Sequence, residues 1–270
     1  DFVLSSGTRG WPKKVEDASE KSLMALEQEK IRMQELLEEE KGEFEKDLKA
    51  YAARVGQFKE HGDLGQLNKI VEEANALQDE LLEAVQRAES FNRREQVFGW
   101  EPTEYSSLAK LQAEFAPFFR LWSMMSDFRA GRDQWLNGNF RSLEPTSIEA
   151  SVQEWWTGSY RLMRQLADVS PAAAEVASTL RSETTEFRGH LPLITALASP
   201  ALRERHWLQV SHELGQPVSL DDEGLTLRSL LEMDVLDHME RIEEIATYAE
   251  KEYALEKSLR NMKEEWADIR

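Results

Sequence analysis

The chain has 270 residues, of which 31% are charged and 41% hydrophobic, with 13 Gly and 8 Pro, and this composition favours a helix-rich protein over a sheet protein or a disordered tail. Its 51 acidic and 33 basic residues give a formal charge of −18, which repels phosphate backbones and anionic lipids and makes nucleic acid and membranes poor candidate partners. The chain has no cysteine, which excludes disulfides and thiolate metal sites.

The sequence also lacks targeting signals. No apolar run approaches the roughly 20 residues that a membrane span needs, and the first residues lack the basic and hydrophobic regions of a signal peptide. The chain starts without Met and ends within a helical pattern. We therefore expect it to be a piece of a longer protein.

Two long helices are predicted at the start. Between residues 13 and 60, apolar residues recur mostly at spacings of three, four or seven, which places them in one narrow stripe on a charged rod. The stripe consists of Leu23, Leu26, Met33, Leu37, Phe44, Leu48, Tyr51, Val55 and Phe58. A second stripe runs from Leu64 to Phe91, and Gly62 and Gly65 supply a turn between the two. The pattern predicts an antiparallel hairpin.

A more aromatic helix is predicted next. Its stripe consists of Leu108, Leu111, Phe115, Phe118, Trp122, Met125, Phe128 and Trp135. Thr103 is placed to cap this helix, and Pro117 inside it is expected to kink or split it. The turn Asn137-Gly138-Asn139 follows. A capping box of Thr146 and Glu149 is predicted to begin the next helix.

Further helix ends are predicted from capping residues. Ser170 and Ser199 each precede a proline, which is the pattern of a helix start, and Gly215 is predicted to end a helix. Residues 216–224 form a polar loop in this interpretation, after which a short helix and then a long one run to Trp266. Because no period-two pattern is sustained, the sequence predicts an all-α fold: an elongated helical bundle in which a long antiparallel hairpin precedes further helices.

The sequence contains no recognisable motif for phosphate binding, metal binding or nucleophilic catalysis. A phosphate-binding loop of the type GxxxxGK[ST] is absent, because no glycine is followed by lysine. His206 and His212 point away from each other on one helix and make a poor metal pair, and no serine lies in a glycine-flanked nucleophile turn. We predict no catalytic, cofactor-binding or metal-binding residue, and expect that this segment is not itself an enzyme.

The tryptophans have two interpretations. Trp122, Trp135, Trp155 and Trp156 could wall an apolar pocket for a cofactor. Packing between helices is the favoured use, because large rings supply most of the area that a bundle buries.

Two arginines in the last third of the chain also have two interpretations. Arg203 and Arg205 flank Glu204 and could bind phosphate or a carboxylate of a partner. Alternatively they form surface salt bridges around a buried Trp207.

The most particular stretch of the chain runs from Leu191 to Trp207. It begins with Leu191-Pro192-Leu193-Ile194 and ends with the run Ala201-Leu202-Arg203-Glu204-Arg205-His206-Trp207. This pattern resembles a signature of dynein heavy chains at the passage from the tail to the linker, in N-terminal region 2. Other landmarks resemble the family in the same order, namely Phe118–Trp122, Trp135–Phe140, Glu154–Trp156 and Tyr253–Leu259. The resemblance covers Leu108 to Trp266 and favours axonemal heavy chains.

The resemblance implies a mechanical role. In dyneins the linker is a helical rod that lies across a ring of AAA ATPase modules and changes shape with nucleotide state. Residues 1–100 would be an acidic tail hairpin, 101–190 an aromatic tail bundle, and 191–270 the first linker helices. The residues expected to serve this role are Trp122, Trp135, Trp155, Trp156, Leu191, Pro192, Arg203, Arg205, His206, Trp207 and Trp266.

The same resemblance implies the surroundings of the segment. ATP and Mg would bind in the parent motor and no cofactor in this fragment. The partners would be the AAA ring, the dynein intermediate and light chains, and microtubules indirectly, within the cytoplasmic cytoskeleton of a ciliary or flagellar axoneme. Independently of the resemblance, the glycine, proline and charge content of residues 221–224 and 189–192 predicts hinges there. The alternative is a free-standing spectrin-like or coiled-coil scaffold that binds other helical proteins.

Overall fold

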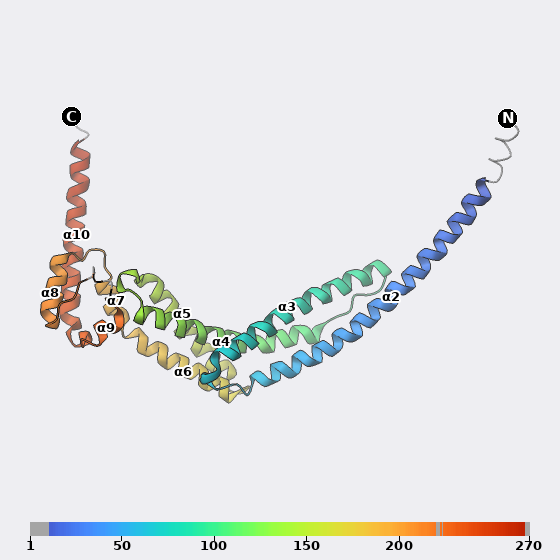
Figure 1. Cartoon of the computed structure of the whole chain (residues 1–270), viewed down its shortest axis with the longest axis horizontal. Coiled ribbons are helices and arrows are strands. Elements are labelled where there is room, and N and C mark those ends of the chain that lie inside the picture. Colours follow the sequence, from blue (N-terminus) through green and yellow to red (C-terminus); the bar gives the residue numbers. More distant parts are fainter. Residues whose placement is uncertain (1–10, 220–221, 223, 268–270) are drawn as a thin grey trace. The chain divides into compact units, whose positions relative to one another are not determined.

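The fold is all-α, as the sequence predicts. The computed structural model of the chain describes residues 11–219, 222 and 224–267 (Figure 1). Within these ranges the only extended pairing is an isolated bridge between Asn139 and Thr226. The elements are α2 (Trp11–Phe58), η1 (Leu64–Gln66), α3 (Leu67–Phe98), α4 (Ser106–Asn137), η2 (Phe140–Ser142), α5 (Pro145–Leu166), α6 (Pro171–Arg188), α7 (Leu191–Leu197), α8 (Glu204–Leu214), α9 (Leu227–Leu231), η3 (Val235–His238) and α10 (Met239–Ala267).

The described residues divide into two compact units. The first contains the described residues up to Phe58 together with Asn75–Ala116, and the second contains Lys59–Ala74 together with the described residues from Pro117 onward. The division of the chain at residues 100 and 190 stays a prediction. In the described part of the chain, no helix combines the length and the hydropathy of a bilayer span.

The first unit is built on the predicted hairpin. Its helices are antiparallel, because ion pairs join residues that advance along α2 to residues that recede along α3. These pairs are Glu40 with Arg94, Asp47 with Arg87, and Arg54 with Glu80. Between them the rings of Phe44 and Phe91 meet edge to face, with centroids 5.5 Å apart. The stripe therefore buries its aromatic side chains where α3 accompanies α2.

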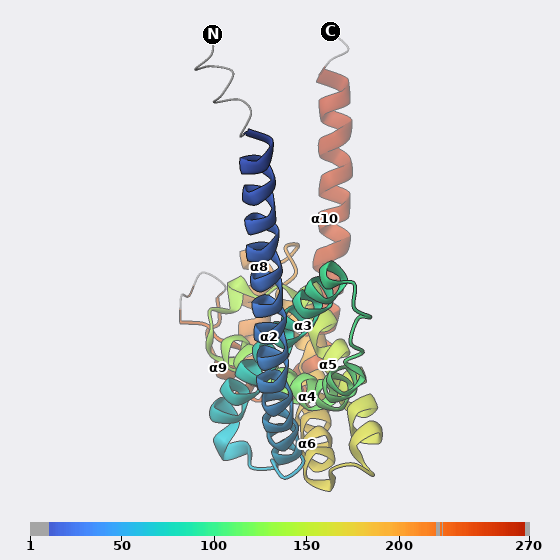
Figure 2. The ribbon, with the colours of Figure 1, turned by 90° about the vertical axis from the view of Figure 1, so that its right-hand side faces the viewer.

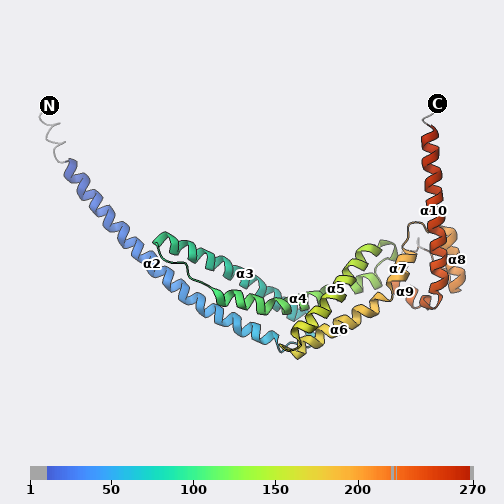
Figure 3. The ribbon, with the colours of Figure 1, turned by 180° about the vertical axis from the view of Figure 1, so that it is seen from behind.

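The apolar stripe of α2 continues past the end of α3. Leu37 and Phe44 are fully buried, whereas Leu23 is 64% exposed and Leu26 67% exposed. Figures 1 and 3 show the N-terminal part of α2 extending beyond the end of α3. Burial of a regular stripe thus depends on the length of the partner helix.

A Schellman motif ends α3. Gly99 has φ +75°, a left-handed conformation that glycine adopts without strain. Its N–H donates to the carbonyl of Gln96, and the N–H of Trp100 donates to the carbonyl of Glu95. The side chain of Glu95 is buried beneath this turn and accepts hydrogen bonds from the backbone N–H and the hydroxyl of Thr103, at 2.7 and 2.6 Å.

The second unit contains a paired helix core. Helices α5 and α6 lie side by side in Figures 1 and 3 and contact each other extensively. Beside them, Arg129 and Arg132 of α4 pair with Glu183 of α6. α7 packs on α5 and α10, and α8 packs on α10. This group of helices positions the residues that the sequence singled out.

Several predicted helix ends are confirmed. The hydroxyl of Ser170 accepts the N–H of Ala173 at 3.1 Å and caps α6. Gly215 ends α8 in a left-handed conformation with φ +66°. α4 ends at Asn137, at the predicted turn. Each of these caps is satisfied by bonds within a few residues, which is why the local sequence predicts them.

Three predicted helix starts are wrong, and one of two outcomes expected at Pro117 is excluded. Thr103 does not cap α4, which begins at Ser106, because its hydroxyl serves the buried Glu95. The capping box at Thr146 is not used, because Pro145 already begins α5 and its fixed φ suits the first helical position. Ser199 does not start α8, because residues 199–202 form a tight turn that buries Ala201 and Leu202. Pro117 lies inside α4, so the helix is not split there, and the kink stays a prediction.

Candidate mechanical junction between α8 and α10

The junction begins where the chain enters α8. Arg203 is extended, with φ −108° and ψ 167°, and it precedes the first helical residue, Glu204. Its backbone N–H donates to Nδ1 of His206 at 3.0 Å. This bond satisfies a backbone donor at the helix end, which would otherwise need water or another side chain. Behind it the side chains of His206, Trp207 and Val210 are buried.

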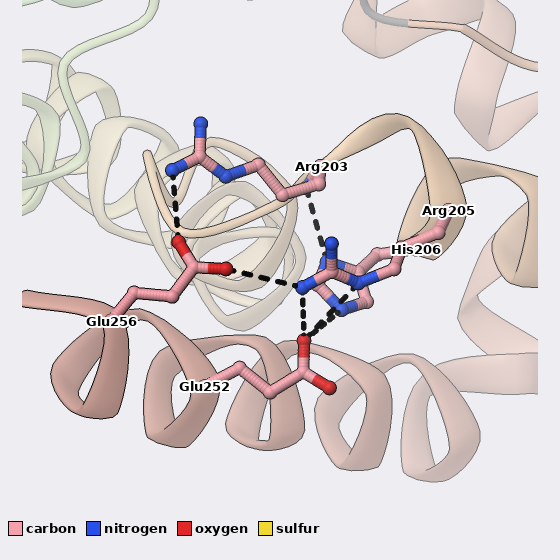
Figure 4. A network of polar contacts seen from close by, with 5 residues as sticks. All are labelled: Arg203, Arg205, His206, Glu252 and Glu256. Atoms are coloured by element: carbon pink, nitrogen blue, oxygen red, sulfur yellow. Dashed lines mark hydrogen bonds and ion pairs between the residues drawn. The ribbon is translucent and has the colours of Figure 1, made fainter. Parts of the chain in front are cut away.

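Two arginines and one histidine of α8 meet two carboxylates of α10 (Figure 4). Arg205 donates to Oε2 of Glu252 through Nε, at 3.2 Å, and through its terminal nitrogen. Arg205 also lies 3.6 Å from Glu256, and Arg203 lies 3.4 Å from the other oxygen of that carboxylate. Because Glu252 and Glu256 are one helical turn apart, one face of α10 engages both arginines.

His206 is the buried member of this cluster, with 2% of its surface exposed. Since its Nδ1 accepts the Arg203 N–H, the proton of the neutral ring lies on Nε2. Nε2 is 3.2 Å from Oε2 of Glu252 and donates to it in this tautomer. The ring thus joins the first turn of α8 to α10 through both of its nitrogens.

The ion pairs also shift acid–base equilibria. Hydrogen bonding from Arg205 holds the pKa of Glu252 below its ordinary value. In turn, hydrogen bonding to Glu252 raises the pKa of Arg205. Both groups are partly exposed, so the junction is a surface network around a buried histidine and tryptophan, in which Glu252 and Arg205 each favour the charged form of the other.

Leu191 and Pro192 lie beside this junction, at the start of α7. Together with Arg188 they line a groove of about 530 Å³ whose opposite wall is formed by Glu243 and Glu250 of α10, among others. Pro192 is exposed, whereas the next two residues of α7 are buried. The side of α7 opposite its buried residues therefore faces a mixed apolar and acidic groove.

The predicted tryptophans do not form one site. Trp122 is fully buried in α4. Trp135 packs on Trp155 and on Phe187, with centroids 5.7 and 5.2 Å apart. Trp156 does not join these rings, since its own ring contacts Arg181 and Arg188 of α6. These contacts are packing between helices, which is the favoured interpretation of the aromatic stripe.

Trp266 lies apart from the other predicted residues. It is 76% exposed near the end of α10, and Figures 1 and 2 show this part of α10 extending past α8. Leu255, Leu259 and Met262 on the same stretch are also exposed. The final helical turns thus present apolar side chains that no described residue covers.

The sequence did not identify the partners of Arg203 and Arg205. Glu252 and Glu256 are two of 51 acidic residues, and many acidic residues have a neighbour at the same spacing. The only pattern that could have indicated the contact is the spacing of the charges, four residues between Glu252 and Glu256 and two between Arg203 and Arg205. Among the described residues, no group of three or more His, Asp or Glu side chains could hold a metal ion.

Comparison with known proteins identifies the family. The family model described as "Dynein heavy chain, N-terminal region 2" matches residues 108–270. The chain belongs to the dynein heavy chain family. The resemblance carried by the run from Arg203 to Trp207 is thereby confirmed, and so is its start near Leu108.

Dynein heavy chains that resemble this one come from several animals. Dynein axonemal heavy chain 1 of Mus musculus is 30% identical over 271 aligned positions that include 100% of this chain. Dynein axonemal heavy chain 3 of Homo sapiens is 28% identical over 84% of the chain, and dynein axonemal heavy chain 12 of Homo sapiens is 26% identical over all of it. The chain spans only 6% of the length of the first two relatives and 9% of the third.

Proposed function

We propose that this segment is the tail-to-linker passage of an axonemal dynein heavy chain and acts as a non-catalytic mechanical element. The observation that carries the proposal is the junction of Arg203, Arg205 and His206 with Glu252 and Glu256. It lies in the stretch that most resembles the family and fixes the direction of α10 against α8. A helix held by a buried histidine and several ion pairs transmits displacement instead of absorbing it.

The parent motor supplies the chemistry in this proposal. ATP and Mg bind in AAA modules outside this segment, and the motor acts on microtubules in a cilium or flagellum. The exposed apolar stripes near Leu23 and Leu259 support the presence of further chain or accessory subunits beside this segment, since large apolar stripes are seldom left in water. The AAA ring and the intermediate and light chains are the proposed occupants.

The experiment changes Glu252 to Arg in a complete motor that contains this chain. We expect microtubule gliding to slow while ATPase activity is largely kept, because an arginine at position 252 would repel Arg205 and free α10 from α8. The combined change Arg205→Glu with Glu252→Arg should recover part of the velocity, since it reverses the pair. Glu264→Arg is the matched control, because Glu264 is exposed on the same helix and has no ion pair among the described residues.

Unchanged gliding velocity in a folded Glu252→Arg motor would contradict the proposal. Equal loss of velocity in Glu264→Arg would also contradict it, since the effect would then follow net charge and not the junction. Loss of ATPase activity in proportion to velocity would indicate a role in coupling to the AAA ring and not in force transmission.

Two hinges are proposed within the segment. Gly189 and His190 form a two-residue break between α6 and α7. In the other predicted hinge Asp221 and Glu223 lie outside the described residues, while Asp222 accepts the N–H of Gly224 at 2.9 Å. We expect amide hydrogen exchange at residues 189–192 to be faster than in α6 and α7. Protection equal to those helices would remove the hinge from the proposal.

A further inference from the structure

The outer surface of α5 and α6 carries a cluster of aromatic and basic side chains. It consists of Trp156, Tyr160, Arg164, Arg181 and Arg188, which we call the arginine–aromatic surface. We propose that this surface binds an acidic helix of a protein partner, whose carboxylates pair with the three arginines. The inference concerns a binding site separate from the junction of α8 and α10 and does not depend on the mechanical proposal.

Trp156 is held in a fixed position at the centre of the surface. Its indole N–H donates to the hydroxyl of Thr185 at 3.1 Å, and that hydroxyl donates to the carbonyl of Arg181 at 2.7 Å. The guanidinium carbons of Arg181 and Arg188 lie 4.3 and 4.5 Å from the centroid of the ring. Since these arginines are two turns apart on α6, the indole lies between them and orders both.

Tyr160 extends the surface by one turn of α5. Its ring is 4.7 Å from the guanidinium carbon of Arg181 and 6.0 Å from that of Arg164. Arg181 also donates to the carbonyl of Trp156 at 3.2 Å. Cation–π contacts occupy the flat face of a guanidinium and leave N–H groups at its edge for carboxylates. The arginines are therefore arranged in advance for recognition of an anion.

The arginines of this surface lack carboxylate partners. Among the described residues, no Asp or Glu oxygen forms a salt bridge with Arg164, Arg181 or Arg188, although the chain carries 51 acidic residues. Elsewhere in the described ranges, arginines at helix contacts are paired. Examples are Arg54 with Glu80, Arg87 with Asp47, Arg129 with Glu183 and Arg205 with Glu252. Three arginines of one surface are therefore left without an internal carboxylate and are available to an external anion.

The nearest acidic groups do not neutralise the surface. Glu183 and Glu186 lie on other faces of α6, more than about 100° around the helix from Arg181 by its 3.6-residue period. Glu183 is engaged by Arg129 and Arg132. Glu149 shares the α5 face of Trp156 and lines the groove beside Arg188, but it makes no ion pair with that arginine. Glu243 and Glu250 of α10 line that groove as well, and neither forms an ion pair with Arg188. The positive charge of the surface is therefore greatest at Arg164 and Arg181, which do not line the groove.

An acidic helix fits this surface better than a polyanion does. Arg181 and Arg188 are separated by two turns, about 10 Å along the axis, which is the distance between carboxylates at positions i and i+7 of a partner helix. The total charge of −18 repels long polyanions such as nucleic acid and anionic membranes. A short acidic helix meets only the local positive surface, because salt screens the remaining charges over about 8 Å.

The test uses a designed helical peptide with Glu at positions i, i+4 and i+7, labelled for fluorescence anisotropy and titrated with the 270-residue chain. We expect binding that weakens as salt is raised, and a shift of the Trp156 indole N–H signal in the NMR spectrum. Arg181→Glu with Arg188→Glu should weaken binding by about tenfold or more. At each position the peptide loses an attractive charge pair and gains a repulsive one, and the two effects on the binding free energy add. Arg181→Lys with Arg188→Lys should give an affinity between those of the unchanged chain and the Glu variant. Lysine keeps the positive charge but lacks the paired N–H donors of the guanidinium group.

The control is Arg161→Glu, which is compared with Arg181→Glu alone, because each makes one Arg→Glu change and Arg161 is an exposed arginine of α5 that contacts neither ring. Its affinity should stay close to that of the unchanged chain. Absence of binding by the Glu peptide, equal binding of a Gln version, or equal weakening by Arg161→Glu would overturn the proposal. Tighter binding of a single-stranded oligonucleotide or of phosphatidylserine vesicles, lost on Arg181→Glu with Arg188→Glu, would overturn it in favour of another class of partner.

Discussion

Replacing Trp122 by Ala is expected to lower the free energy of unfolding of the second unit by about 3–5 kcal/mol. Trp122 is the largest of the fully buried side chains and has 0% of its surface exposed. Its removal forfeits the transfer free energy of the indole and leaves a cavity that packed neighbours fill only in part. Chemical denaturation followed by circular dichroism measures the loss.

Two further variants make the Trp122 prediction specific. Trp122→Phe should cost much less, because a ring still fills the site and the indole N–H has no acceptor among the described residues. Trp266→Ala is the matched control at an exposed tryptophan, and it should change stability by less than about 0.5 kcal/mol. Similar losses for Trp122→Ala and Trp266→Ala would show that Trp122 is not the core residue that its burial indicates.

The spacing of apolar residues predicts the helices but not the extent of their burial. Leu23 and Phe44 belong to one stripe of constant period, yet the first is exposed and the second is fully buried. The difference arises because α3 ends at Phe98, where the antiparallel pairing leaves α2 without a partner. Period is a local property of the sequence, whereas burial depends on the length of another helix.

Helix caps were predictable where their bonds are local. Ser170 and Gly215 satisfy neighbours within a few residues, and both predictions are confirmed. Thr103 failed because it is bonded to Glu95, eight residues earlier in the chain and buried. Glu95 itself gave no signal, because it is one carboxylate in an acidic helix. Capping rules consider only neighbouring residues and do not predict a hydrogen bond to a buried side chain of the preceding helix.

The candidate junction was predictable in part for the same reason. The resemblance drew attention to Arg203, Arg205 and His206, which do meet in the structure. Their carboxylate partners come from a helix about 50 residues later, where the sequence offers many equivalent acids. The arginine–aromatic surface was not predicted. The sequence favoured packing between helices as the use of Trp156 and did not indicate that its ring contacts arginines of α6.

Replacing Lys41 by Met is expected to destabilise the first unit by about 3 kcal/mol at neutral pH, because it breaks a buried ion pair and leaves one charge uncompensated. Glu95 is 1% exposed and lies 2.7 Å from Nζ of Lys41. The double change Lys41→Met with Glu95→Leu should recover a large part of the loss, since removing both charges costs less than isolating one. Thermal unfolding of the three proteins in parallel makes the comparison.

The pH dependence of this variant follows from the pKa shifts of the pair. Burial alone would raise the pKa of Glu95, but hydrogen bonds from Lys41 and Thr103 outweigh it and hold the pKa below its ordinary 4.5. Burial would lower the pKa of Lys41, but its bonds to Glu95 and Glu38 outweigh that effect and raise the pKa above 10.5. The stability from Glu95 is thus present above pH 4.5 and lost as pH falls through its lowered pKa. The stability from Lys41 is present below pH 10.5 and lost as pH rises through its raised pKa.

The loss of unfolding free energy caused by Lys41→Met should therefore depend on pH. At neutral pH the variant buries a carboxylate that has lost its lysine, whereas in acid that carboxyl group takes up a proton and the penalty disappears, since burial favours its neutral form. The difference in unfolding free energy between the unchanged chain and the variant should shrink as pH falls from 7 toward the lowered pKa of Glu95. A difference that stays constant over this range would mean that lost packing of the lysine stem, and not the isolated charge of Glu95, accounts for the destabilisation.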